Sequence, residues 1–340
     1  MAHRLLAGDG SSHGERSGSR SVLIESTYRS PWYLPGADLQ TVVPHLRSIR
    51  DVTYKRQRVE LDDGDFVDVD WSAEERDRLV IVVHGLEGHA GRPYMRSTVR
   101  AFNRAGWDAL AWNMRACSGE VNRTAGFYHA GLSADLAAVL EHAMQVRAYE
   151  CIALVGFSLG GNLILKYLGE QGTRVPAALR AAATFSVPCD LADAAHAIHR
   201  RRNAFYLRRF IRHLRKKVRR KAAALPGVID VEGLDDLRDL RAFDSRYTAP
   251  VHGYTSADDY WASNSCIHFL PAIRIPSLIV NANNDTFLGT RCYPYETVRS
   301  LDRVYMEVPH SGGHVGFPLK GGDSWMERRA LQFFDGVISD

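Results

Sequence analysis

Short apolar segments rich in β-branched residues alternate along this chain with longer segments whose apolar residues recur at helical spacing. A short run that is apolar on both faces is typical of a strand buried inside a parallel sheet. Parallel strands need crossover connections, and helices supply them, so the alternation predicts a doubly wound α/β sheet. A hairpin is predicted around residues 51–70, followed by strands over residues 79–85, 108–116, 151–158, 179–188, 275–285 and 303–310.

One polar, basic and mostly helical stretch, from about residue 190 to 270, interrupts the alternation. We therefore predict an α/β core in two parts, residues 26–190 and 271–340, with a helical cap inserted over residues 191–270. Residues 1–25 lack the apolar stretch of an export signal and are predicted to form a flexible tail. Core helices are predicted over residues 92–106, 131–147 (with Ser133 as N-cap), 159–172 and about 324–337.

Composition narrows the class of protein without identifying it. The chain has 340 residues, 45% hydrophobic and 24% charged, which excludes collagen-like and wholly disordered classes. No apolar run reaches the roughly 18 to 20 residues that a membrane-spanning helix needs. The five cysteines are scattered without a Cys-x-x-Cys pair, so we expect reduced thiols and a cytoplasmic protein. No phosphate-binding loop, dinucleotide fingerprint or metal-ligand cluster is visible in the sequence, and we expect no cofactor and no metal.

The net charge of +4 hides one strongly basic segment. Residues 199–221 contain 12 Lys and Arg and no acid, which leaves 31 basic against 39 acidic residues in the rest of the chain. Two interpretations stay open: peripheral binding to an anionic membrane, or a cap helix that packs on the core while its charges are solvated. A nucleic acid partner is disfavoured, because an Arg-rich helix alone carries no means of reading bases. The segment is predicted to be helical because its apolar residues recur at helical spacing, at Leu207, Phe210, Ile211, Leu214 and Val218.

A Gly-x-Ser-x-Gly motif spans residues 156–160, where the predicted strand 151–158 meets the helix after it. A serine on such a tight strand-to-helix turn holds its hydroxyl above the sheet, and small neighbours leave room for the turn. The alternative is a glycine-rich turn that only packs the helix against the strand. Because a buried strand precedes the motif and a helix follows it, we predict that Ser158 is a nucleophile.

A nucleophilic serine needs a base, and the base needs an acid that orients it. Asp285 follows the predicted strand 275–285, and His314 lies in a glycine-flanked loop after the last strand. The order Ser158, Asp285, His314 is that of α/β-hydrolases and differs from both unrelated serine-protease orders. We predict these three residues as a catalytic triad. The competing residues are His310 for the base and Asp190 for the acid.

The tetrahedral intermediate of acyl transfer needs two donors for its oxyanion. The backbone amide of Leu159, at the start of the helix after Ser158, is one predicted donor. The loop after the strand 79–85 reads His-Gly-Leu-Glu-Gly, and its Leu86 amide is the predicted second donor. His84 resembles a catalytic base, but it follows a buried strand directly, and we expect it to shape this loop by hydrogen bonding.

Several segments of the chain are longer and less generic than the Gly-x-Ser-x-Gly motif. They begin at about Tyr28 and continue to the C-terminal region. Together they are similar to the YheT-like branch of the α/β-hydrolase superfamily and to ABHD-related serine esterases. The segments are LPGADLQTVVP (34–44), ELDDGDFVDVDW (60–71), HGLEG (84–88), CSGEVNR (117–123), GFSLGGN (156–162), APVHGYTSADDYW (249–261) and GGHVGF (312–317).

This resemblance implies an α/β-hydrolase fold and a serine carboxylesterase, with Ser158, Asp285 and His314 at the matching triad positions. The branch includes enzymes that act on acylglycerols and phospholipids, which implies a small-molecule acyl ester as substrate. Two residues depart from the branch's pattern: Ala116 stands where the pattern has Gly, and Thr286 stands where it has Pro. The alternative function is a catalytically idle hydrolase scaffold that binds an anionic membrane or another polyanion through its basic cap helix.

Overall fold

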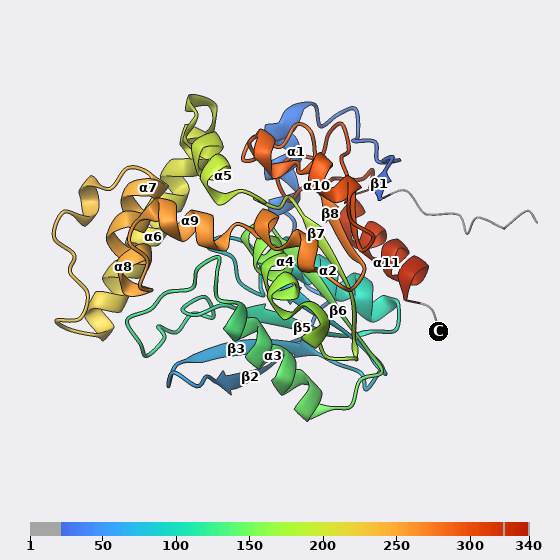
Figure 1. Ribbon diagram of the computed structural model, residues 1–340, viewed down its shortest axis with the longest axis horizontal. Helices are drawn as coiled ribbons and strands as arrows, with labels where there is room; N and C mark the ends of the chain where they lie inside the picture. The colour runs from blue at the N-terminus through green and yellow to red at the C-terminus, as the bar shows by residue number, and fades with distance from the viewer. Residues whose placement is uncertain (1–21, 322–323, 339–340) are drawn as a thin grey trace, which may run out of the picture.

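A nine-stranded sheet forms the centre of the computed structural model, which describes residues 22–321 and 324–338 (Figure 1). The strand order is β1-β9-β8-β7-β6-β4-β5-β3-β2, and neighbouring strands are parallel except that β3 runs antiparallel to β2 and β5. The predicted α/β class is therefore confirmed. The strands are β1 (Leu23–Ile24), β2 (Lys55–Glu60), β3 (Phe66–Ser72), β4 (Arg78–Val83), β5 (Asp108–Asn113), β6 (Cys151–Phe157), β7 (Leu179–Phe185), β8 (Ser277–Val280) and β9 (Val304–Glu307).

Helices cover both faces of the sheet, which explains why the central strands are apolar on both sides. Alternate side chains of β4 enter two different cores: Leu79, Ile81 and Val83 join one, and Val80 and Val82 join the other. The first core includes apolar residues of α3 (Ser133–Val146) and α4 (Leu159–Gln171). The second includes those of α2 (Pro93–Arg104) and α11 (Trp325–Val337). Burial on two faces removes the polar alternation that a half-exposed strand would show.

The short helix α10 (Tyr295–Arg299) lies between β8 and β9. Two local predictions need correction. Ser133 is the first residue of α3 rather than its N-cap, which is Leu132, and no side chain caps this helix. Most of the predicted tail lies outside the described residues, but Leu23–Ile24 form β1 and pair with β9 at the sheet edge. A two-residue strand on an edge is too short to give a periodic signal in the sequence.

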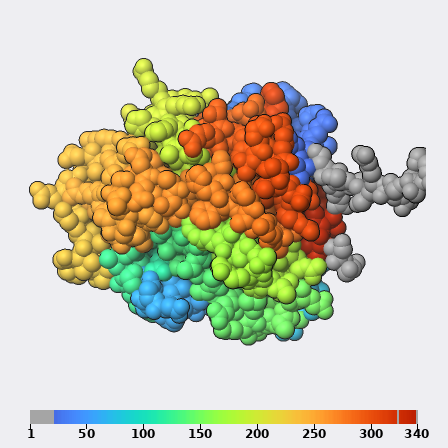
Figure 2. All heavy atoms as spheres, viewed as in Figure 1, coloured from blue at the N-terminus to red at the C-terminus, as the bar shows by residue number. Residues whose placement is uncertain are grey.

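Five α-helices, together called the cap below, lie between β7 and β8, in the stretch where the sequence interrupts the alternation (Figures 1 and 2). The predicted basic helix 199–221 is displaced along the chain, because α5 includes His199 and a 3₁₀ turn separates it from α6. As predicted, α6 packs through its apolar stripe, whose residues Leu207, Ile211, Leu214 and Val218 are buried. The helices are α5 (Leu191–His199), α6 (Ala204–Ala224), α7 (Leu240–Phe243), α8 (Ala249–Val251) and α9 (Ala257–Asn264).

Not all of the charges on α6 are solvated. Lys221 is fully buried, and its ammonium donates hydrogen bonds to the carbonyls of Ala125 and Gly126 and lies over the Phe127 ring. Burial lowers the pKa of Lys221 to about 7. Lys217 also turns inward, toward the loop that follows β4. The interpretation in which the charges of this helix are simply solvated is therefore wrong for Lys217 and Lys221.

All five cysteines are free thiols, and four of them are buried. Within residues 22–321 and 324–338, no helix combines the length and apolarity needed to cross a membrane.

Ala116 occupies a backbone conformation that favours glycine. Its φ is 58°, in the loop after β5, and this is the position where the YheT-like pattern has Gly. A β-carbon in the left-handed region costs roughly 1–2 kcal/mol, which exceeds the extra freedom that glycine has in the unfolded chain. We expect Ala116→Gly to raise the free energy of unfolding by about 0.5–1 kcal/mol in urea denaturation. Ala105, with a φ of −87°, is the matched control, and Ala105→Gly should not stabilise the protein. Equal effects of the two substitutions would contradict this explanation.

Candidate active site

Ser158 lies on the tight turn between β6 and α4. Its φ of 51° and ψ of −121° are strained for a residue with a side chain, a conformation that costs on the order of 1–3 kcal/mol. The two motif glycines make the turn possible: a Cβ on Gly160 would lie 2.4 Å from the His84 carbonyl oxygen, and one on Gly156 would lie 2.6 Å from Ile164 Cδ1. The glycine residues therefore let α4 approach the strands closely while the turn holds the serine hydroxyl above the sheet.

The structure brings the three predicted triad residues together at the carboxyl ends of the strands. Nε2 of His314 lies 3.0 Å from Oγ of Ser158, and Nδ1 of His314 lies 2.8 Å from Oδ2 of Asp285. The carboxylate of Asp285 is fully buried, and its other oxygen accepts a hydrogen bond from the Phe287 amide at 3.0 Å. The Phe287 ring also stacks on the imidazole, with ring centroids 4.3 Å apart. These contacts fix one orientation of the histidine between the serine and the acid.

The competing residues lie elsewhere. His310 is exposed at the end of the β9 segment. Asp190 caps α5, accepting a hydrogen bond from the Asp193 amide, and pairs with Arg291 at 2.8 Å. His84 is fully buried and links two backbones, through Nδ1 to the Gly85 carbonyl at 2.8 Å and through Nε2 to the Met114 amide at 3.2 Å. Burial lowers the pKa of His84 to about 3, so it stays neutral and shapes the loop, as expected.

The loop after β4 lies against the serine turn. A Cβ on Gly85 would be only 3.0 Å from Cβ of Ser158, so glycine lets the two backbones approach. Within the described residues, neither the Leu86 amide nor the Leu159 amide donates a hydrogen bond to another protein group. The neighbouring amides do have acceptors, since Gly85 donates to the Tyr94 hydroxyl and Glu87 to the Tyr128 hydroxyl. The two amides predicted for the oxyanion are therefore left available.

The basic cap helix holds this same loop. Lys217 of α6 forms an ion pair with Glu87 at 2.8 Å, and both side chains are largely buried. Glu87 has a φ of 54° and also accepts a hydrogen bond from the Tyr128 hydroxyl at 2.9 Å. The Lys217 ammonium lies over the Tyr128 ring, 4.2 Å from its centroid. Because Glu87 follows Leu86 directly, the cap fixes the backbone that presents one of the two predicted oxyanion donors.

Sequence reasoning missed α1 (Gly36–His45), a helix that supports the histidine loop. Thr41 Oγ1 accepts a hydrogen bond from the His314 amide at 2.9 Å, and Gln40 Oε1 accepts one from the Gly312 amide at 2.9 Å. Asn284 joins this network, donating to Gln40 Oε1 and accepting from the Gly313 amide. The only sequence signal was the LPGADLQTVVP segment, which carried the resemblance but no assigned role.

Thr286, the second departure from the YheT-like pattern, connects the acid loop to the cap. Its hydroxyl donates to the Asn203 side chain at 2.7 Å, and the Asn203 amide group donates back to the Thr286 carbonyl at 2.7 Å. Proline would keep the carbonyl contact and lose the hydroxyl. The substitution therefore adds one hydrogen bond between the acid loop and the residue that precedes α6.

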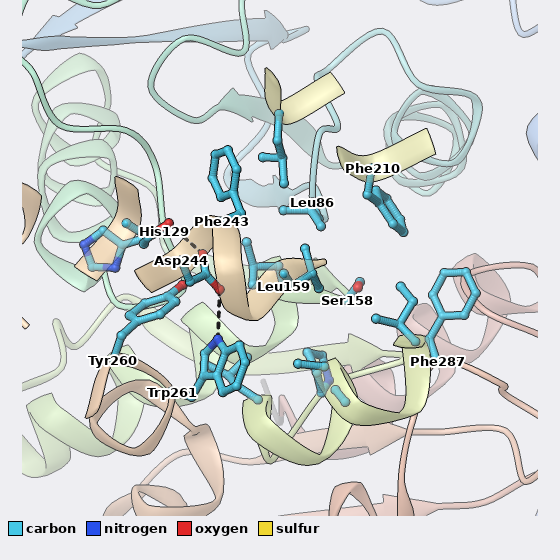
Figure 3. A pocket seen from close by; sticks show the side chains of 18 of the residues that line it. Leu86, His129, Ser158, Leu159, Phe210, Phe243, Asp244, Tyr260, Trp261 and Phe287 are labelled. Atoms are coloured by element: carbon cyan, nitrogen blue, oxygen red, sulfur yellow. Dashed lines mark hydrogen bonds between the residues drawn. The ribbon is translucent and has the colours of Figure 1, made fainter. Parts of the chain in front are cut away.

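Two pockets meet at Ser158 and His314. The first, the apolar pocket, lies between the serine turn and the cap (Figure 3). The second, the α1–α6 pocket, lies on the other side of the serine and is lined by both helices and by the loop after β4. Leu86, Phe210 and Phe287 border both. Other lining residues of the apolar pocket include Leu191, Ile198, Leu214, Leu240 and Phe243. Those of the α1–α6 pocket include Val42, Leu46, Arg92, Phe205, Arg209 and His213.

Asp244 is a polar group in the apolar pocket. Figure 3 shows it beside Tyr260 and Trp261, on the opposite side of Leu159 from Ser158. Its carboxylate accepts hydrogen bonds from the Thr248 hydroxyl at 2.6 Å and from the Trp261 indole at 2.9 Å. Burial raises the pKa of Asp244 from its usual value near 3.8 to about 6. The folded state therefore binds this proton more tightly than the unfolded state does.

The free energy of unfolding should depend on pH, because the folded and unfolded states bind the Asp244 proton with different affinities. Stability contributed by protonated Asp244 is complete below about pH 4 and is lost as the pH rises through about 6. Relative to Asp244→Asn, the wild type should therefore lose roughly 3 kcal/mol of unfolding free energy between pH 4 and pH 7. Urea denaturation of both proteins across this range measures the difference. A constant difference between the two proteins would show that the carboxyl group titrates normally.

Comparison with known proteins defines the class. The model of the α/β hydrolase fold family matches residues 78–320, and the chain belongs to this family. Among proteins of known structure, an esterase of Pyrococcus furiosus superposes with a TM-score of 0.58 at 16% identity, over 86% of this chain and 97% of that one. At this identity the likeness concerns the fold alone, and it confirms the predicted α/β-hydrolase architecture.

Relatives identified by sequence show which branch of the family the chain belongs to. The chain is 36% identical over 303 residues to YheT of Escherichia coli, which is named as a candidate esterase, covering 86% of this chain and 88% of YheT. It is 27% identical over 331 residues to mouse phospholipase ABHD3, covering 93% of this chain and 80% of that protein. The resemblance to the YheT-like branch is therefore confirmed, and the chain is an esterase-type member of the α/β hydrolase family.

Proposed function

We propose that this protein is a serine hydrolase that cleaves carboxylic esters through Ser158, His314 and Asp285. The observation that carries the proposal is the pair of contacts at His314: 3.0 Å from Nε2 to the Ser158 hydroxyl and 2.8 Å from Nδ1 to the Asp285 carboxylate. A binding scaffold has no need of this geometry. Esterase and phospholipase relatives over most of the chain support the same reaction class.

In the proposed mechanism, Nε2 of His314 takes the proton of Ser158 as the serine oxygen attacks the ester carbonyl. The buried carboxylate of Asp285 holds the Nδ1 proton, keeps the imidazole in the reactive tautomer, and stabilises its charged form. His314 then protonates the leaving alcohol, and an acyl-enzyme remains on Ser158. A water molecule, deprotonated by the same histidine, releases the acid and restores the serine.

The oxyanion of each tetrahedral intermediate is assigned to the amides of Leu86 and Leu159. Leu159 stands at the N-terminus of α4, where the helix dipole favours negative charge. Each such donor is worth about 2.7–4 kcal/mol of transition-state stabilisation in enzymes where one has been removed. The ion pair between Lys217 and Glu87 supports the Leu86 amide from the cap.

The two pockets would bind different parts of an ester substrate. The apolar pocket fits an acyl chain, because aliphatic and aromatic side chains from the cap and core line it. The α1–α6 pocket would take the alcohol part, and Arg92 and Arg209 favour an anionic or polar group there. Short- to medium-chain acyl esters, including lipid-derived esters such as acylglycerols and phospholipids, are the proposed substrate class.

Hydrolysis of p-nitrophenyl esters with acyl chains from C2 to C16 tests this proposal. We expect turnover with an optimum set by the apolar pocket. Enlarging that pocket by Phe243→Ala should move the optimum toward longer chains, while Val146→Ala on the surface should leave it unchanged. A folded wild-type protein that hydrolyses none of these esters would contradict the proposal and favour the idle scaffold.

A further inference from the structure

Exposed apolar side chains lie on the α1–α6 pocket and on the chain next to it. Leu46 is 77% exposed, Phe205 is 68% exposed and Val42 is also exposed, and all three line the pocket itself. Leu39 lies on the outer face of α1, and Trp32, 89% exposed, lies four residues before α1 begins. Single exposed apolar residues are common on soluble proteins, but five on or next to the helices that line one pocket form a patch.

The two helices that carry this patch are in direct contact although they come from distant parts of the sequence. The hydroxyl of Tyr206 in α6 donates a hydrogen bond to Asp38 in α1 at 3.0 Å. Both helices line the same pocket. Figure 1 draws α1 (blue) and the start of the inserted helices (yellow-green) along the same edge of the molecule, and the segment near residue 200 stands out there in Figure 2.

The cations in the two halves of the basic helix α6 differ in whether they have interaction partners. In the C-terminal half, Arg219 pairs with Asp235, Lys217 pairs with Glu87, and Arg220 donates to the Gly119 carbonyl. Lys216 is the exception there, an exposed cation with no carboxylate at ion-pair distance among the described residues. The N-terminal half and the turn before it carry exposed cations with no carboxylate at ion-pair distance in the described part of the chain. These cations are Arg201, Arg202, Arg208, Arg209 and Arg212.

The uncompensated arginines and the apolar patch lie at the same end of α6. A surface that combines exposed Trp and Leu with adjacent cations matches a bilayer interface, where apolar side chains enter the acyl region and cations meet anionic headgroups. A nucleic acid would use the arginines but not the apolar patch. A second copy meeting this one face to face would bring like charges together.

We propose that α1 with Trp32, and the N-terminal half of α6, form a docking surface for an anionic lipid bilayer at the mouth of the α1–α6 pocket. This docking gives access to lipid-derived esters, and in that respect it rests on the proposed function. The basic helix therefore binds lipid through one end, since its other end is held by the loop beside Ser158. Helix α1 contributes to both the docking surface and the site. Its Leu39 and Val42 side chains are exposed, and its Thr41 side chain bonds the His314 amide.

Sedimentation with phosphatidylcholine vesicles, with and without phosphatidylglycerol, tests the proposal. We expect the wild type to bind the vesicles that contain phosphatidylglycerol. Two variants, Trp32→Ser/Leu39→Ser and Arg201→Gln/Arg202→Gln/Arg208→Gln, should each bind them at least about tenfold more weakly. None of the altered residues lines either pocket, so hydrolysis of soluble p-nitrophenyl butyrate should stay within about twofold of the wild type.

Two matched controls separate the surface from general effects. Val146→Ser removes an exposed apolar side chain at the end of α3, and Arg219→Gln/Arg220→Gln removes two charges from the C-terminal half of α6. Both should bind vesicles like the wild type. Equal losses in the controls, or wild-type binding by the two test variants, would overturn the proposal. A wild type that does not bind anionic vesicles would also overturn it. So would a dimeric wild type that Trp32→Ser/Leu39→Ser dissociates, because the surface would then be an interface between two copies.

Failure of this proposal and failure of the proposed function are distinguishable. Ser158→Ala should bind the anionic vesicles as the wild type does while hydrolysing no ester. A wild type that hydrolyses esters but does not bind anionic vesicles would reject the surface alone, whereas a wild type that binds the vesicles but hydrolyses no ester would reject the enzyme and keep the surface.

Discussion

Replacing Ser158 by alanine is expected to lower kcat for ester hydrolysis by about a millionfold, with little change in the free energy of unfolding. In the proposed mechanism the hydroxyl oxygen forms the acyl-enzyme, and its removal leaves only the pockets and the two amides to assist water. The hydroxyl's contact with His314 is 3.0 Å long and sits between the two pockets, so its loss leaves the cores unchanged.

Ser300→Ala is the control for this experiment, because Ser300 is an exposed serine after α10 whose hydroxyl donates a hydrogen bond to the nearby Thr297 carbonyl. It should keep wild-type kcat and KM. Steady-state kinetics on p-nitrophenyl butyrate, with urea denaturation alongside, measures both effects. Substantial hydrolysis by a folded Ser158→Ala protein would mean that another residue is the nucleophile.

Replacing Asp285 by asparagine is expected to lower kcat by about 10⁴-fold, with a much smaller change in KM. An asparagine side chain that turns its NH₂ toward Nδ1 makes that nitrogen an acceptor, which leaves the imidazole proton on Nε2. The imidazole can then no longer accept the serine proton. The substitution keeps the size of a fully buried side chain and can keep the bond from the Phe287 amide, so the loop geometry should persist.

Asp190→Asn provides the matched control, since Asp190 was the competing candidate for the acid. It loses an ion pair with Arg291, while the asparagine oxygen can still cap α5, so it should reduce stability slightly and leave kcat within a few fold. The opposite pattern, with Asp190→Asn inactive and Asp285→Asn active, would reverse the assignment of the acid.

The sequence was sufficient to predict the sheet core and the three side chains that are proposed to react. Burial on both faces made each central strand visible as an apolar run, and the parallel arrangement placed Ser158, Asp285 and His314 at the same edge of the sheet. The structural role of His84 could also be predicted, because a histidine that directly follows a buried strand is held by backbone groups rather than by solvent.

The residues that hold the loops of the site in place could not be predicted in the same way. Gln40 and Thr41 act on the His314 loop from more than two hundred residues away in the sequence, and a short helix with a proline in it has a weak periodic signal. The sequence also could not predict that Lys217 turns inward, because its neighbours in the sequence are equally basic. Only tertiary packing decides which cations of a basic helix are buried.

Covalent labelling with a fluorophosphonate, located by peptide mass spectrometry, is the most direct measurement of the central claim. The account predicts one adduct per chain, on the peptide that carries Ser158, with hydrolysis lost in proportion to labelling. Ser158→Ala should take up no label, and Ser300→Ala should label like the wild type. An adduct on a different residue, or full hydrolytic activity in a quantitatively labelled protein, would contradict the account.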